Sequence, residues 1–522
     1  MTEVKVHSLP SDDDGIQFFA VARPVAPEVD RRAADGRADS QSDSQSDSES
    51  DPAGSVAQAP GPRLTAETSG AITWYSLPEP AVTVAEPDVA IPAGGVDVPA
   101  PPVAEIAHAC EPEFVLARSA PTAGQPEPES RRRLVGVDMA RGIALLGMMA
   151  VHIVSSETAA GTMSTAWALA AGKSAALFAV LAGVGIAFTT GGTQVLHGRR
   201  RTAAAAALAV RAMLIGCLGL LLGSLVPIDT AGVILAYYAV LFLLAIPLLG
   251  LSVRTLVVLT ALTAVAIPVA SHMVRGAMTA PELGNPTFAD LVGAPGDLVA
   301  ELTLTGLYPA LPWIAYVCAG LAIGRSRLTA RGFVMGMTAA GVALACVSSA
   351  ASWAMMERLG GRAQLADVAM RSMPLDEYTG LLVWGADGTL PTTSAWWLTV
   401  LAPHTTTPVD ILYTIGVAIA VIGACIIVGW VTRSVLRPLA AAGSMPLTLY
   451  TLHLLLLVAP FTPDREGTSF LLQVGTLLTF ATLWGRRFDR GPLEQVVWRV
   501  TGNVRSQILD RGEAAGGRRP AR

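Results

Sequence analysis

About ten apolar runs follow one another from residue 137 onward, and they constrain this chain more than any other feature. Each is about 20 residues long, the length at which a helix spans the hydrocarbon core of a bilayer. The runs lie at 137–156, 167–188, 204–225, 231–250, 254–273, 305–324, 333–353, 409–430, 441–460 and 468–485. We therefore predict an all-α, polytopic integral membrane protein of about ten transmembrane helices.

The charges of the connecting loops alternate in sign. One set of loops is basic and carries Arg199, Arg200, Arg201, Arg325, Arg327, Arg331, Arg433, Arg437, Arg486 and Arg487. The other set carries Glu157, Asp229, Glu282, Asp290, Asp297, Asp376, Glu377 and Asp387. Positive residues are retained in cytoplasmic loops, so the asymmetry predicts ten helices with both chain termini cytoplasmic.

The chain divides into three parts by composition. Of its 522 residues 52% are hydrophobic and 15% are charged, yet the first 130 are polar. Segment 39–51 is an acidic serine repeat, and 77–128 is rich in Pro, Ala and Val, so we predict a disordered cytoplasmic tail over 1–130. A docking or phosphorylation segment is the alternative. The transmembrane domain would occupy 131–500, and 501–522 would form a flexible basic tail.

Several classes of function are disfavoured. The basic residues form no stripe with interleaved aromatics, so we expect no nucleic-acid partner. No CxxC or Cys/His spacing occurs, so we expect neither a zinc site nor a disulfide framework. The N-terminus lacks an apolar signal-peptide core, so the first membrane helix would act as the insertion signal.

The segment 360–408 is too long for a tight turn. We expect it to form short interfacial helices, with Trp384, Trp396 and Trp397 at the level of the lipid headgroups.

Three ionisable residues, Asp138, Arg141 and His152, interrupt the first apolar run. Such residues are costly in lipid and are therefore functional candidates. At about 100° per residue they fall within about 60° of one another on the helix, so they share a face that should point into protein. Asp138 and Arg141 can pair at i, i+3. His152 lies about 21 Å beyond Asp138, in the outer half of the membrane.

His152 has two interpretations: a neutral histidine bonded between helices, or a general base. Lys173, on the second run, is predicted at the same height, where its charge would keep His152 neutral; otherwise it would snorkel to the interface. Arg211 lies inside the third run and would pair with a carboxylate or meet an anionic ligand from the cytosol.

Two further histidines occur at membrane depth. His404 stands before the eighth run in APHTTTPVD, within a polar external cluster. His453 lies within the ninth run, where a structural hydrogen bond is the favoured interpretation. The motif YPALPWIAY at 308–316 places two prolines at the outer mouth of a helix, which indicates either a cavity lining or aromatic anchoring at the interface.

Several segments carry a resemblance to a known family. VDMARGIALLGMMAVH, GKSAALFAVLAGVGIAF and YPALPWIAYVCAGLAIGR occur in the first half. PHTTTPVDILYTIGVAIAVIG, GSMPLTLYTLHLLL and FDRGPLEQVVWR follow in the second. In this order they resemble membrane acyltransferases related to heparan-α-glucosaminide N-acetyltransferase and bacterial YeiB-type proteins, within an acyltransferase family 3-like superfamily.

The resemblance implies a ten- or eleven-helix fold, cytosolic acyl-CoA (acetyl-CoA) as co-substrate, and a glycan or lipid-linked acceptor at the far side. It implies a catalytic histidine near that side. In the heparan enzyme this histidine lies in the loop after the first helix, where the present chain has none, so His152 and His404 both stand as candidates, with Lys173 assisting. Arg141 and Arg211 would meet the acyl-CoA phosphates.

Two other functions remain open at this stage: a transporter or lipid flippase, and a non-catalytic envelope scaffold. Ala- and Arg-rich usage points to a bacterial cell membrane, with membrane lipids as neighbours. Whether the chain forms a homo-oligomer is left open.

Overall fold

The computed structural model describes residues 134–278, 283–386, 388–431, 436–460 and 465–516. The predicted tail over 1–130 lies outside the described residues, as do the loop charges at Glu282, Asp387 and Arg433. The described part consists of helices and contains no strand, so the predicted all-α class is confirmed.

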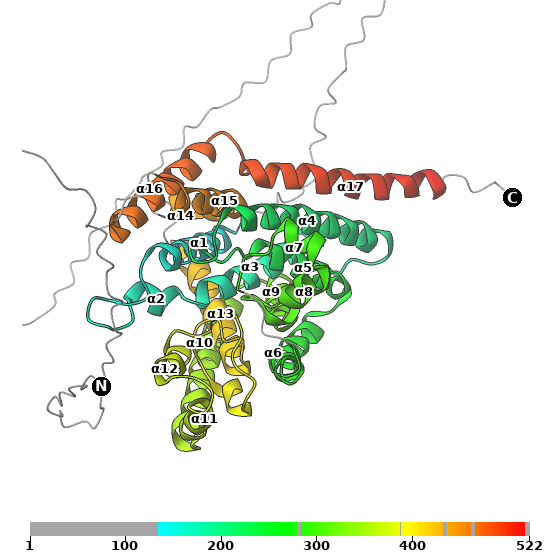
Figure 1. Cartoon of the computed structure of the whole chain (residues 1–522). Helices are drawn as coiled ribbons and strands as arrows, with labels where there is room; N and C mark the ends of the chain where they lie inside the picture. Colours follow the sequence, from blue (N-terminus) through cyan, green and yellow to red (C-terminus); the bar gives the residue numbers. More distant parts are fainter. Residues whose placement is uncertain (1–133, 279–282, 387, 432–435, 461–464, 517–522) are drawn as a thin grey trace, which may run out of the picture. The chain divides into compact units, whose positions relative to one another are not determined.

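The helices are α1 (Val135–Ile153), α2 (Thr165–Ala170), α3 (Lys173–Thr189), α4 (Gly198–Leu225), α5 (Leu235–Ala245), α6 (Val253–Arg275), α7 (Phe288–Gly293), α8 (Pro295–Ala300), α9 (Ala310–Gly324), α10 (Arg331–Trp353), α11 (Gly361–Ala369), α12 (Leu375–Val383), α13 (Pro408–Val431), α14 (Arg437–Ser444), α15 (Pro446–Leu457), α16 (Glu466–Trp484) and α17 (Pro492–Gly516) (Figure 1). Four short 3₁₀ or π turns accompany them: η1 (Pro247–Gly250), η2 (Glu301–Thr305), η3 (Ala354–Arg358) and η4 (Ala395–Thr399).

Within the described residues, seven helices are long and apolar enough to cross a membrane, or up to nine if each of two bent pairs counts as one span. The bent pairs are α8–η2 with α9, and α14 with α15, which turn by 51° and 90°. The run predicted at 231–250 corresponds to the shorter helix α5. Each predicted apolar run therefore has a helical counterpart, but not each is a straight span.

Helix α1 packs against α3, α13 and α14, and α3 packs in turn against α9. The approach of α3 to α9 depends on Gly183 and Gly320, because a Cβ on Gly183 would lie 2.6 Å from the carbonyl oxygen of Val317. Small residues are the usual means by which membrane helices come this close. The LAGVG motif therefore allows α3, the helix beside α1, to pack closely against α9.

Residues 354–402 form a small helical cap with an apolar cluster of its own, built from Met356, Leu365, Ala369, Tyr378, Ala386, Leu390, Trp397, Val400 and Ala402. Trp397 is 1% exposed and donates a hydrogen bond from Nε1 to Oγ1 of Thr393. Trp397 is therefore packed inside the cap and does not face lipid, and its level relative to the headgroups stays a prediction. Its indole fills the cap, because burying so large a ring against apolar neighbours is strongly favourable.

Helix α17 runs beside α4 (Figure 1). Nε of Arg199 donates to the carbonyl of Ile508 over 2.7 Å, and Arg505 donates to the carbonyl of Thr189 over 3.3 Å. The structure thus differs from the expected flexible tail over residues 501–516. The first bond holds α17 against the arginine-rich start of α4, and the second ties it to the end of α3.

Candidate active site

Helix α1 carries a charged pair near its start and a histidine in its last turn. Arg141 donates to Oδ1 of Asp138 over 2.8 Å, which is the i, i+3 pair expected from the sequence. Both side chains are largely removed from solvent, at 22% and 7% exposed. His152 lies eleven residues beyond Arg141, about 16 Å along the helix. One helix face therefore joins two polar sites at different depths.

His152 is hydrogen-bonded to His453, with Nδ1 of the first 3.1 Å from Nε2 of the second. The ring planes differ by 2° and the centroids are 5.3 Å apart. The centroid separation is close to the sum of the nitrogen–nitrogen distance and the two ring radii. The two rings therefore lie end to end in one plane and are not stacked face to face. Nδ1 of His453 lies 2.9 Å from Oε1 of Gln473. We call this series of His152, His453 and Gln473 the histidine chain.

His404 stands in the loop between η4 and α13 (residues 400–407), which we call the His404 loop. Its backbone is left-handed, with φ of 59°, and that of Thr406 has φ of 54°. Such strain in non-glycine residues is concentrated at functional sites. The His404 ring meets the edge of Tyr308 with centroids 5.5 Å apart. His404 is also close enough to His152 to interact with it electrostatically. The structure thus brings both candidate histidines into one region.

His404 is held neutral by its surroundings. Burial, and to a smaller extent the nearby charge of Lys173, together lower the pKa of His404 from 6.5 to about 4. Its Nδ1 is buried and has no hydrogen-bond partner among the described residues. A neutral imidazole with an unused ring nitrogen can accept a proton or bind a substrate group.

Lys173 begins α3 and donates from Nζ to the carbonyl of Ala168 over 2.9 Å. The side chains close enough to act on His152 electrostatically are His453 and His404, whereas Lys173 acts on His404 and Asp410. Lys173 was expected to tune His152, but the structure associates it with His404.

Gly172 explains how α3 comes so near the His404 loop. Its φ is +69°, which favours glycine, and a Cβ there would lie 3.3 Å from the backbone nitrogen of His404. The break between α2 and α3 therefore sets the distance between Lys173 and His404.

Arg141 and Arg211 lie close enough to repel one another electrostatically, and we call them the basic pair. Arg211 stacks over Phe242, with its guanidinium carbon 5.1 Å from the ring centroid. Nε of Arg211 is buried without a hydrogen-bond partner among the described residues. Two guanidinium groups with an unused donor suit an anion such as a phosphate.

The Glu494 carboxylate, which acts on Arg211 electrostatically, makes its hydrogen bonds elsewhere. It accepts hydrogen bonds from the backbone N–H groups of Leu447 and Thr448, over 2.7 Å and 3.1 Å, at the start of α15. It also accepts from the Thr448 hydroxyl over 2.5 Å. Negative charge at a helix N-terminus is stabilising, so Glu494 serves chiefly to cap α15.

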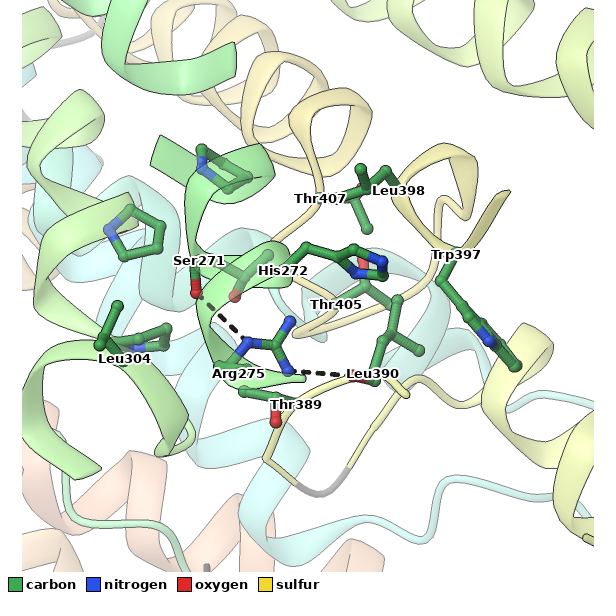
Figure 2. Close-up of a pocket in the computed structure, with 14 residues that line it drawn as sticks. Ser271, His272, Arg275, Leu304, Thr389, Leu390, Trp397, Leu398, Thr405 and Thr407 are labelled. Atoms are coloured by element: carbon green, nitrogen blue, oxygen red, sulfur yellow. Dashed lines mark hydrogen bonds between the residues drawn. The ribbon is translucent and has the colours of Figure 1, made fainter. Parts of the chain in front are cut away.

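A narrow cleft adjoins the His404 loop, and we call it the Arg275 cleft (Figure 2). Its lining comes from the end of α6, the start of α9, the cap and Thr405–Thr407. Arg275 donates to Oγ of Ser271 over 3.2 Å and to the carbonyl of Leu390 over 3.0 Å. In this conformation the free space is about that of one water molecule. A larger ligand would have to displace the loops that line it.

The prolines of YPALPWIAY line this cleft, while Tyr308, Trp313 and Tyr316 are 6%, 3% and 2% exposed. The cavity-lining interpretation therefore holds and anchoring in the aromatic belt does not.

Two residues of the site were not identified as functional from the sequence. His453 was interpreted as structural, and Gln473 was not singled out. His453 is 0% exposed and Gln473 is 6% exposed. The sequence signal that could have identified both residues is a polar side chain within an apolar run. The partners lie 301 and 20 residues apart in sequence, so periodicity could not join them.

No curated protein sequence matches the chain. A family model does: residues 133–355 match the one described as heparan-alpha-glucosaminide N-acetyltransferase, catalytic. The match spans α1 to α10 and includes Arg141, His152, Lys173 and Arg211, whereas His404 and His453 lie beyond it. The resemblance predicted from the sequence is thus confirmed over residues 133–355, as a similarity to the catalytic part of heparan-α-glucosaminide N-acetyltransferase.

Proposed function

We propose that the protein is a membrane acetyltransferase that moves the acetyl group of cytosolic acetyl-CoA to an amine or hydroxyl of a glycan acceptor on the outer side. The observation that carries this proposal is the arrangement on α1: a basic pair toward one end and the histidine chain toward the other, about 16 Å apart. The match to a glucosaminide N-acetyltransferase family over residues 133–355 supports the reaction class and the glycan acceptor.

The distance between the basic pair and His152 limits which acetyl donors can contact both. A compact donor such as acetyl phosphate cannot reach the basic pair and His152 at once. Acetyl-CoA can, because its phosphates and its thioester stand at opposite ends of a long flexible arm. Arg141 and Arg211 would bind the phosphates, and Nε of Arg211 offers a donor without an acceptor in the described residues.

His152 would act as general base in the transfer. The acceptor nitrogen or oxygen attacks the thioester carbonyl, its proton passes to Nε2 of His152, and the carbon–sulfur bond breaks. The departing thiolate then takes that proton, so that CoA leaves as the thiol. His404 is the alternative base, or the carrier of the acetyl group in a two-step reaction. Lys173 would offset negative charge near His404 as the carbonyl oxygen becomes an oxyanion.

The acceptor would approach through the Arg275 cleft. The cleft borders the His404 loop and is lined by an arginine and threonine hydroxyls, groups that suit sugar hydroxyls. The arginine bias of the loops supports an orientation in which this end lies outside the cytosol.

The test uses the full-length protein in lipid nanodiscs with radiolabelled acetyl-CoA and an α-glucosaminide as acceptor. We expect CoA release and labelled glycan, both dependent on the acceptor. The matched control is the Arg211→Met variant, which keeps the apolar stem and should need more acetyl-CoA for the same rate. Absence of CoA release from the wild-type protein, with and without the acceptor, would refute the proposed function.

A further inference from the structure

The histidine chain ends on a side chain that fixes the direction of all its hydrogen bonds. Oε1 of Gln473 is a carbonyl oxygen and can only accept, so Nδ1 of His453 must carry the hydrogen. A neutral imidazole holds one hydrogen, which leaves Nε2 of His453 as an acceptor. Nδ1 of His152 must then be the donor across the 3.1 Å contact.

The remaining ring nitrogen of His152 is its Nε2. With its one hydrogen on Nδ1, neutral His152 presents an unprotonated Nε2. Nε2 of His152 has no hydrogen-bond partner within the described residues, and the His152 side chain is only partly buried. The nitrogen that would take a proton from the acceptor is therefore the one left free.

We propose that His453 and Gln473 are positioning residues that lock His152 in the tautomer with Nε2 unprotonated, so that it serves as the base in acetyl transfer. The proposal rests on the proposed function and adds two residues outside the stretch matched by the family model. Both are nearly inaccessible to solvent, so neither touches a substrate in this conformation.

The coplanar geometry supports this role. End-to-end rings place the Nδ1–H of His152 in the plane of the His453 lone pair, the favoured hydrogen-bond direction. When His152 takes a proton on Nε2, the bond to His453 becomes charge-assisted and strengthens. The charge can move no further than His453, because a glutamine carbonyl does not accept a proton at neutral pH. The proton therefore remains available for the thiolate.

Two substitutions at position 453 separate this role from packing. His453→Leu fills the space without an acceptor, whereas His453→Gln can place Oε1 where Nε2 stood and accept from His152. We expect His453→Leu to lower kcat about 10- to 100-fold, as when the partner of an oriented histidine is removed. His453→Gln should stay within a few-fold of wild type, and KM for acetyl-CoA should change little in both. Both are compared as monodisperse full-length protein.

A direct measurement of the tautomer needs no activity. The chain has seven histidines, so a protein labelled with ¹⁵N at histidine Nε2 alone gives a simple solid-state spectrum in lipid. The His152→Asn variant assigns the His152 signal by its loss. We expect an unprotonated Nε2 signal for His152 in the wild type, and partial conversion to the protonated form in Gln473→Leu, which frees His453 to take either tautomer.

The outcomes are distinct. A protonated Nε2 on resting His152 would overturn the proposal, because it means that the Gln473 amide donates and every bond in the chain runs the other way. Equal kcat in wild type and His453→Leu, or equal loss in His453→Leu and His453→Gln, would also overturn it. A wild-type protein without transferase activity would instead refute the proposed function, and the spectrum would still decide the direction of the chain.

Discussion

Replacing Gly172 with alanine tests whether catalysis depends on the position of the His404 loop. At the observed φ of +69° and ψ of −42°, a sparsely populated region for residues with a side chain, a Cβ costs about 1–3 kcal/mol. The added carbon would also lie 3.3 Å from the nitrogen of His404 and 3.3 Å from Cα of Pro403, so the loop must move by a few tenths of an ångström. A displacement of about 1 Å can cost about 100-fold in rate, so we expect kcat to fall about 10-fold.

Gly192 provides the matched control. Its φ is +63°, so alanine there is also strained, but its Cβ would meet nothing within 4 Å among the described residues. Both variants are purified in the same detergent, and thermal unfolding and acetyl transfer are measured on each. We expect similar losses of stability, with the loss of kcat confined to Gly172→Ala. Equal kcat in the two variants would refute the claim that the contact with Gly172 sets a catalytically important distance.

Three further predictions follow from the basic pair, from His404 and from the loop charges. Arg211→Met should weaken acetyl-CoA binding about 10-fold or more, measured by calorimetry, because a charge-assisted contact to phosphate is lost; unchanged affinity would place the donor elsewhere. Because the pKa of His404 falls from 6.5 to about 4 on folding, the unfolded chain binds the extra proton, so stability should decline as the pH falls from 6.5 to 4. That decline, followed by unfolding midpoints across the range, should be smaller in His404→Gln; equal slopes would contradict it. A cysteine at Asp229 should react with an impermeant maleimide in intact cells and one at Arg200 should not, and the reverse pattern would invert the proposed topology.

The elements of the fold were predictable because bilayer-spanning helices leave a strong signal. A run of about 20 apolar residues is typical of a membrane-spanning helix. Every predicted run has a helical counterpart in the structure. The pairing of Asp138 with Arg141 was predictable for a similar reason, since helix geometry alone sets an i, i+3 contact.

The bends within the helical runs were harder to predict from the sequence. The run at 441–460 was interpreted as one helix, but it turns by 90° between α14 and α15. Pro446 stands at the first turn of α15, where its missing N–H is tolerated, and it disfavours helical geometry at Met445. Pro446 was the local signal for this break. The run around it is apolar throughout, so it was interpreted as one continuous helix.

The assembly of the site depends on contacts that no local pattern encodes. His152 and Lys173 were expected to meet because adjacent helices form a hairpin, yet Lys173 acts on His404, which is 231 residues away in sequence. The partner of His152 comes from α15. Such pairings follow from tertiary packing, here from close approaches such as that of Gly172 to the His404 loop.

The central claim, that the free nitrogen of His152 is the base in acetyl transfer, is tested most directly by His152→Asn. The asparagine amide can still donate to Nε2 of His453, so the variant keeps the contact of the histidine chain and removes only the Nε2 of His152. Acetyl transfer and acetyl-CoA affinity are measured on the same preparation. We expect a rate of acetyl transfer lower by about 10²–10⁴-fold, with affinity for acetyl-CoA within a few-fold of wild type. Full turnover in His152→Asn would contradict it and assign the role to His404.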